Sequence, residues 1–108
     1  MCAFQSLYFD DDGYVVRCPQ CSMFQVAFSS SMLTLSEEDF EALRKVVAYK
    51  CNQQEDAFSK NTKSVLLPTP SYGMYILLTK AEANRFNEIL EEADNEMKAL
   101  LLLSLFDQ

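Results

Sequence analysis

A pair of cysteines in one short turn, Cys18-Pro19-Gln20-Cys21, places the strongest constraint on how this chain folds. The turn stands between Tyr14–Arg17 and Met23–Phe28, two stretches with the apolar pattern of β-strands. Two thiols at this spacing between strands are typical of a zinc knuckle, in which backbone amides point at the thiolates. The same spacing also occurs in dithiols that close a reactive disulfide. The fold must therefore bring two strands together at this cysteine turn (residues 18–21).

A closed zinc site needs two ligands more than the cysteine turn provides. The chain contains four cysteines and no histidine, so the remaining thiolate ligands would be Cys2 and Cys51. Cys2 would arrive if the first strand pairs beside the turn, and Cys51 would arrive from the end of the first helix. One hypothesis is therefore a structural zinc site formed by Cys2, Cys18, Cys21 and Cys51.

Two other interpretations of the cysteines stay open. In the first, Cys18 and Cys21 form a redox dithiol, although a strand pattern follows them here, whereas in thioredoxin-like proteins the first cysteine begins a helix. In the second, the cysteines are ordinary small buried residues that bind nothing. The lack of histidine excludes Ser-His, Cys-His and H-E-x-x-H chemistry, so no catalytic residue is predicted and we expect a protein without enzymatic activity.

The charge of the chain argues against two classes of partner. Nine basic residues against 16 acidic ones give a net charge of −7. The chain has no cluster of Lys and Arg of the kind that binds phosphates in nucleic acids, and its acidity opposes binding to anionic membrane surfaces. No signal peptide pattern is visible, and the longest apolar run is too short to cross a bilayer. We therefore expect an acidic cytoplasmic protein that binds neither nucleic acid nor membranes.

The remaining pattern predicts a single α+β domain over residues 1–108. We expect an antiparallel sheet of about six strands, a meander followed by a hairpin, with two main helices on one face. Ser36 and Thr79 are expected to cap the two helices, because each is followed by acidic residues in the first turn. The acidic stretch Glu91–Glu96 is expected to be a solvated face of the second helix. The expected strands are 5–9, 14–17, 23–28, 32–35, 64–67 and 74–78.

The two halves of the chain resemble each other around the helix starts. Met32–Phe40 and Tyr75–Ala83 both run from a strand directly into a capped helix. The apolar positions that follow also correspond, as in the pairs Leu43 with Phe86 and Val46 with Ile89. An old duplication of a β-hairpin–helix unit would explain this similarity, and so would convergence, because joints of this kind are common.

The C-terminal residues are apolar on every side. Leu100–Leu103, Leu105 and Phe106 cannot all be hidden on one face of a helix. They are either tucked into the core or covered by a second copy, and a domain of this size has little interior to spare. We therefore predict a homodimer contact here. The expected function is a domain that binds itself or another protein, with the cysteines as a structural zinc clip; the alternative is a thiol redox protein.

The first half of the chain resembles a family of small uncharacterised bacterial proteins, classed as a domain of unknown function. The similar pattern spans Leu7–Val47, with one cysteine before it. Ser29 stands where this pattern leads us to expect glycine. The resemblance implies no known activity. The residues that carry it are Cys2, Gly13-Tyr14-Val15, Cys18, Cys21, Gln25-Val26-Ala27-Phe28 and Asp39-Phe40.

Overall fold

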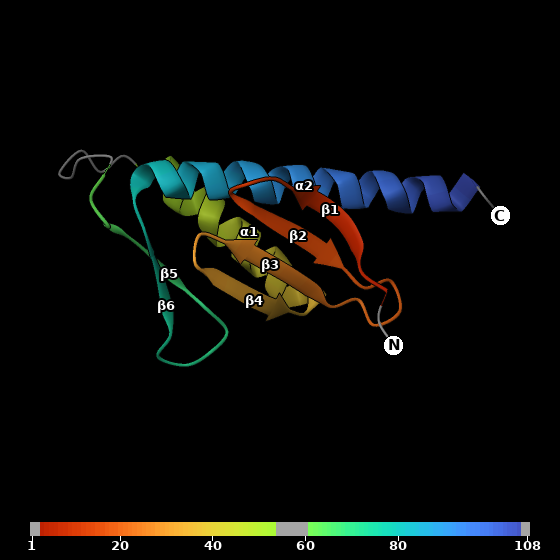
Figure 1. Cartoon of the computed structure of the whole chain (residues 1–108), viewed down its shortest axis with the longest axis horizontal. Helices are drawn as coiled ribbons and strands as arrows, with labels where there is room; N and C mark the ends of the chain where they lie inside the picture. Colours follow the sequence, from red (N-terminus) through yellow and green to blue (C-terminus); the bar gives the residue numbers. More distant parts are fainter. Residues whose placement is uncertain (1–2, 54–60, 107–108) are drawn as a thin grey trace.

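A four-stranded antiparallel sheet and a separate two-stranded hairpin pack with two helices in the computed structural model (Figure 1), which describes residues 3–53 and 61–106. The predicted α+β class is confirmed, with six strands and two helices among these residues, but the strands are divided between two sheets. The elements are β1 (Gln5–Phe9), β2 (Gly13–Arg17), β3 (Phe24–Phe28), β4 (Ser31–Leu35), α1 (Glu37–Asn52), β5 (Val65–Pro68), β6 (Tyr75–Leu78) and α2 (Lys80–Phe106).

Short turns fix the order β1-β2-β3-β4 in the larger sheet. Asp10 closes the first turn, because its Oδ1 accepts hydrogen bonds from the backbone N–H groups of Asp12 at 2.7 Å and Gly13 at 3.1 Å. Ser29 and Ser30 form the turn between β3 and β4, and Ser29 has a φ of 55°. Glycine adopts this left-handed conformation more easily than serine does. The expectation of glycine at this position therefore agrees with the backbone geometry.

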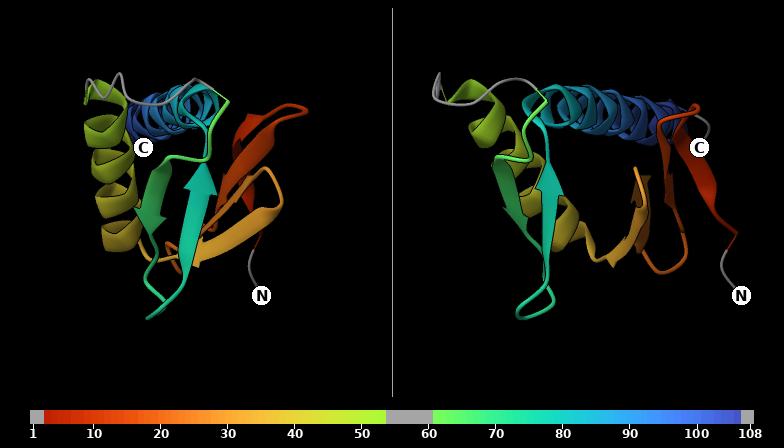
Figure 2. Two further views of the ribbon diagram at one scale, coloured as in Figure 1. Left: turned by 90° about the vertical axis from the view of Figure 1, so that its left-hand side faces the viewer. Right: turned by 60° about the vertical axis from the view of Figure 1, so that its left-hand side comes forward.

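β3 lies against both helices through one of its faces. The ring of Phe24 stacks on Phe40 of α1 with 4.2 Å between centroids, and the ring of Phe28 stacks on Phe86 of α2 with 4.6 Å between centroids. Phe24 and Phe28 share a face because alternate side chains of a strand point the same way. Both helices therefore cover the same face of the larger sheet, as Figure 2 shows from two sides.

The predicted caps begin both helices. Ser36 Oγ accepts a hydrogen bond from the backbone N–H of Asp39 at 3.1 Å, at the start of α1. Thr79 and Glu82 form a reciprocal capping box before α2. The backbone N–H of Glu82 donates to Thr79 Oγ1 at 3.0 Å, and the backbone N–H of Thr79 donates to Glu82 Oε1 at 2.8 Å. With these caps, α1 begins directly after β4 and α2 begins directly after β6.

α2 is a single helix of 27 residues. At a rise of ~1.5 Å per residue it is about 40 Å long. Its buried residues all lie between Ala83 and Asp94, and every residue from Leu101 to Phe106 is exposed. Figure 1 shows this last part of α2 extending beyond the sheet. The first half of α2 therefore belongs to the core, and its end projects from the body of the domain.

Gly13 permits the close approach of β2 to β3. A methyl group on Gly13 would lie 2.2 Å from the backbone oxygen of Ala27, so the strands would have to move apart. We predict that Gly13→Ala lowers the free energy of unfolding by about 2–3 kcal/mol, in the range of overpacked sites. Urea unfolding followed by circular dichroism measures this change.

Gly73 provides the control, because it has a φ of 77° and no neighbouring atom lies within 4 Å of where a Cβ would stand. Gly73→Ala should cost about 1 kcal/mol, through left-handed backbone strain alone. Equal losses for the two variants would contradict the close packing of β2 on β3.

Candidate functional site

The cysteine turn connects the end of β2 to the start of β3, as the sequence predicted. Two backbone hydrogen bonds close it: the Cys18 N–H donates to the carbonyl of Met23 at 2.9 Å, and the Ser22 N–H donates to the carbonyl of Cys18 at 2.8 Å. Ser22 adopts a φ of 62°, which turns the chain back toward β3. Cys18 is fully buried and Cys21 is exposed. The turn therefore holds both cysteines in one tight loop at the edge of the core.

Gln20 links this loop to the beginning of the chain. Its Oε1 accepts a hydrogen bond from Cys18 Sγ at 3.1 Å and a long one from the backbone N–H of Ala3 at 3.5 Å. Ala3 directly follows Cys2 in the sequence. Cys2 itself lies outside the described residues. The backbone N–H of Ala3 therefore lies beside the cysteine turn.

Cys51 lies near the opposite end of α1 from the cysteine turn. The start of α1 is close to the turn, because Arg17 and Glu37 are separated by 3.8 Å between their charged groups. Cys51 is 14 residues farther along this helix, which is about 21 Å at the rise of an α-helix. Its Sγ donates instead to the carbonyl of Ala83 in α2 at 3.1 Å. The structure therefore does not bring Cys51 to Cys18 and Cys21.

The contribution of Cys2 to the predicted four-cysteine site stays a prediction, because Cys2 lies outside the described residues. Across residues 3–53 and 61–106, no group of three or more His, Cys, Asp or Glu side chains is placed to hold a metal ion. Cys18 and Cys21 are the two predicted ligands that the structure places together.

The redox alternative needs a helix that begins at the first cysteine and lowers its thiol pKa. Here β2 precedes Cys18 and β3 follows Cys21, so no helix begins at the cysteine turn. The thiol of Cys18 is also covered by protein on all sides. The local structure therefore lacks the feature on which the redox hypothesis depends, and that hypothesis stays a prediction.

The end of α2 presents a group of large apolar side chains to solvent. We call this group the tail cluster, and its members are Leu101, Leu102, Leu103, Leu105 and Phe106. Their exposed fractions range from 48% to 78%, so none of them lies in the core of its own chain. No charged residue occurs from Ala99 to Phe106. Among the described residues, no helix has both the length and the apolar character needed to span a bilayer.

A buried carboxylate anchors α2 just before the tail cluster. Asp94 is 3% exposed, and its Oδ2 lies 2.8 Å from Lys98 Nζ and 3.7 Å from Arg44 Nε. Arg44 comes from α1 and also contacts Glu91 Oε1 at 3.0 Å. The expectation that residues 91–96 form a solvated face is therefore wrong for Asp94. Lys98 lies one helical turn away, but the second partner, Arg44, is distant in sequence, so no local pattern identifies the contact between Asp94 and α1.

Comparison with known proteins identifies a family. The model of the Family of unknown function (DUF6686) matches residues 1–107, so the chain belongs to this family. No curated protein and no solved structure gave a significant match. The match extends the resemblance noted in the first half of the sequence to nearly the whole chain.

Burial raises the pKa of the Cys51 thiol above its ordinary value. A raised pKa leaves less thiolate at a given pH, and the thiolate is the reactive form. We predict that Cys51 reacts with iodoacetamide at pH 8 at least about tenfold more slowly in the folded protein than in urea, and that the rate rises with pH above the ordinary thiol value. Mass spectrometry of peptides containing Cys51 measures this rate. Equal rates in folded and unfolded protein would contradict the buried position.

Proposed function

We propose that this member of the family is a non-enzymatic domain that binds a second copy of itself through the tail cluster. The observation that carries the proposal is the exposure of five large apolar side chains at the end of one continuous helix. Full burial of one such side chain contributes roughly 1.5–3 kcal/mol. Clustered apolar surface of this kind typically marks an interaction site on a soluble domain.

The charges on α2 support a contact that is limited to its end. Glu88, Glu92 and Glu96 are exposed on the part of the helix that precedes the tail cluster. If two copies were aligned along the whole of α2, these carboxylates would lie close together, and each pair of like charges would repel. Overlap of the uncharged segment Ala99–Phe106 avoids this repulsion. We therefore propose an antiparallel contact in which the two domain bodies lie at opposite ends.

The shape of the tail cluster suits packing between helices. Leu101 with Leu105, and Leu102 with Phe106, are spaced four residues apart and form two apolar ridges. Ridges of this spacing fit into the grooves of a facing helix. The ion pair between Asp94 and Arg44 joins α2 to α1 about two helical turns before these ridges. Association of a surface that is already ordered costs less conformational entropy than association of a loose segment.

A glutamate in the tail cluster should separate the two copies. We predict that Leu102→Glu makes the protein monomeric at concentrations where the wild-type chain is dimeric, because a carboxylate would be buried in the contact. Multi-angle light scattering after size exclusion measures the mass. The matched control is Leu77→Glu on β6, since Leu77 is 55% exposed and Leu102 is 56% exposed.

The two variants distinguish a specific contact from general stickiness. The control should keep the dimer, because Leu77 lies outside the tail cluster. A wild-type chain that is monomeric at high concentration would contradict the proposal. Loss of the dimer in both variants would also contradict it, because any exposed leucine would then suffice.

We also propose that the cysteine turn is half of a structural zinc clip completed from the N-terminal segment. The supporting observation is that Gln20 Oε1 contacts both Cys18 Sγ and the backbone N–H of Ala3. Ala3 directly follows Cys2 in the sequence, and this supports Cys2, Cys18 and Cys21 as the proposed protein ligands. Three thiolates bind zinc well and leave one position for a further donor. Cys51 is excluded from this proposal by its position at the other end of α1.

Metal content tests the clip. Protein purified under reducing conditions should contain about one zinc per chain, and Cys21→Ser should lose most of it. Cys21 is the best position to change because it is exposed. Cys51→Ser is the matched control and should keep its zinc. Absence of zinc from the reduced wild-type protein, or its loss in Cys51→Ser, would contradict the proposed ligands.

A further inference from the structure

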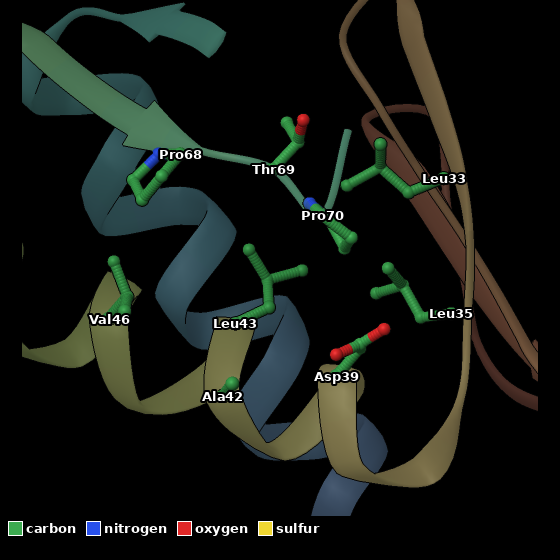
Figure 3. A pocket seen from close by; sticks show the side chains of 9 residues that line it. All are labelled: Leu33, Leu35, Asp39, Ala42, Leu43, Val46, Pro68, Thr69 and Pro70. Atoms are coloured by element: carbon green, nitrogen blue, oxygen red, sulfur yellow. The ribbon is translucent and has the colours of Figure 1, made fainter. Parts of the chain in front are cut away.

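A cavity of about 210 Å³ lies between β4, α1 and the turn of the β5–β6 hairpin (Figure 3). Its walls are largely apolar. The β5–β6 hairpin, whose turn lines the cavity, and the end of α2 lie on opposite sides of the molecule (Figure 1), so the proposed self-association leaves the cavity open. The lining residues are Leu33, Leu35, Asp39, Ala42, Leu43, Val46, Pro68, Thr69 and Pro70.

The size of the cavity limits what can enter it. An apolar cavity of about 150 Å³ is large enough for a benzene molecule. Pockets for cofactors and other complete small ligands are usually larger, about 300–1,000 Å³. The cavity is therefore the right size for one large apolar side chain of a partner.

One carboxylate stands at the edge of this apolar space. Figure 3 shows Asp39 beside Leu35, at one end of the cavity. Within the described part of the chain, the Asp39 carboxylate takes part in no ion pair or side-chain hydrogen bond, while its backbone N–H is used in the cap of α1. Glu37 and Glu38 add negative charge in the same helical turn. This charge, in a chain with a net charge of −7, favours a partner that carries a cation next to its apolar group.

The strand beside the cavity has a free edge. β4 is the last strand of its sheet and pairs only with β3 among the described residues. An exposed edge of this kind can accept the backbone of an extended peptide. Ile76 of the hairpin closes the space near Leu33, where the remaining cavity is only about 10 Å³. Of the two spaces beside β4, the larger one therefore lies at Leu33 and Leu35.

We propose that this groove binds an extended segment of another protein in which an apolar residue and a lysine or arginine are two residues apart. The backbone of the segment pairs with the edge of β4 at Leu33–Leu35. Side chains two residues apart on a strand point to the same face. The apolar side chain therefore enters the cavity while the cation reaches Asp39.

Binding of short blocked peptides to the full-length protein tests the proposal. In fluorescence anisotropy, a labelled peptide of sequence TLTKT should bind about fivefold or more tightly than TLTET, because the lysine meets Asp39. The peptide TLPKT should bind weakly, since proline removes a backbone donor needed for strand pairing. Hexylamine should not compete at concentrations comparable to the peptide, because it has no backbone.

Variants of α1 locate the site. D39N should weaken binding of TLTKT about fivefold and remove the preference over TLTET. E38Q is the matched control, since it removes the same charge from the same turn without lining the cavity, and it should change binding less than about twofold. Unfolding curves confirm that both variants fold. Equal affinity for TLTKT and TLTET, equal effects of D39N and E38Q, or full competition by hexylamine would each overturn the proposal.

The test is independent of self-association. Leu102→Glu changes the tail cluster and should leave binding of TLTKT unchanged. A Leu102→Glu protein that is monomeric and still binds TLTKT would show that peptide binding does not depend on self-association. Loss of peptide binding in Leu102→Glu would overturn a site at β4.

Discussion

The packing of the first half of α2 on the four-stranded sheet is the interaction on which the rest of the structure depends. Phe86 stacks on Phe28 of β3, and Ile89 and Leu90 are buried beside it. This contact joins the sheet, both helices and the hairpin into one core cluster. The buried residues of α2 end at Asp94 while the helix continues to Phe106. The same helix that completes the core therefore carries the tail cluster out of it.

Charged contacts at two places fix the direction of α2. Near its start, Arg85 donates to Asp12 Oδ2 at 2.9 Å and to the Tyr8 hydroxyl at 2.6 Å, and also pairs with Asp10. The hydrogen bond from Tyr8 helps to hold the pKa of Asp10 below its usual value, so this carboxylate stays charged. Farther along, Arg44 and Lys98 flank Asp94. Contacts at both places fix the direction of α2 relative to the sheet and α1, and so fix the direction in which the tail cluster projects.

Features set by neighbouring residues could be predicted from the sequence, and features set by distant contacts could not. The cap at Ser36, the turn at Asp10 and the strands around the cysteine turn follow from local hydrogen bonding and alternation. The division into two sheets depends on how the hairpin packs on α1 and α2, which no local pattern encodes. Burial of Asp94 depends in the same way on Arg44. The distance of Cys51 from the cysteine turn could not be predicted, because the sequence does not show at which end of α1 the turn lies.

We propose that the tail cluster is covered by a second copy of the chain. Sedimentation equilibrium of the unmodified protein tests this contact, because it gives the mass in solution over a wide range of concentration. The mass should rise with concentration from the 12.3 kDa of one chain and level at twice that value. The dimer should persist at high salt, since the contact is apolar and not ionic. A mass of one chain at every concentration would rule out self-association.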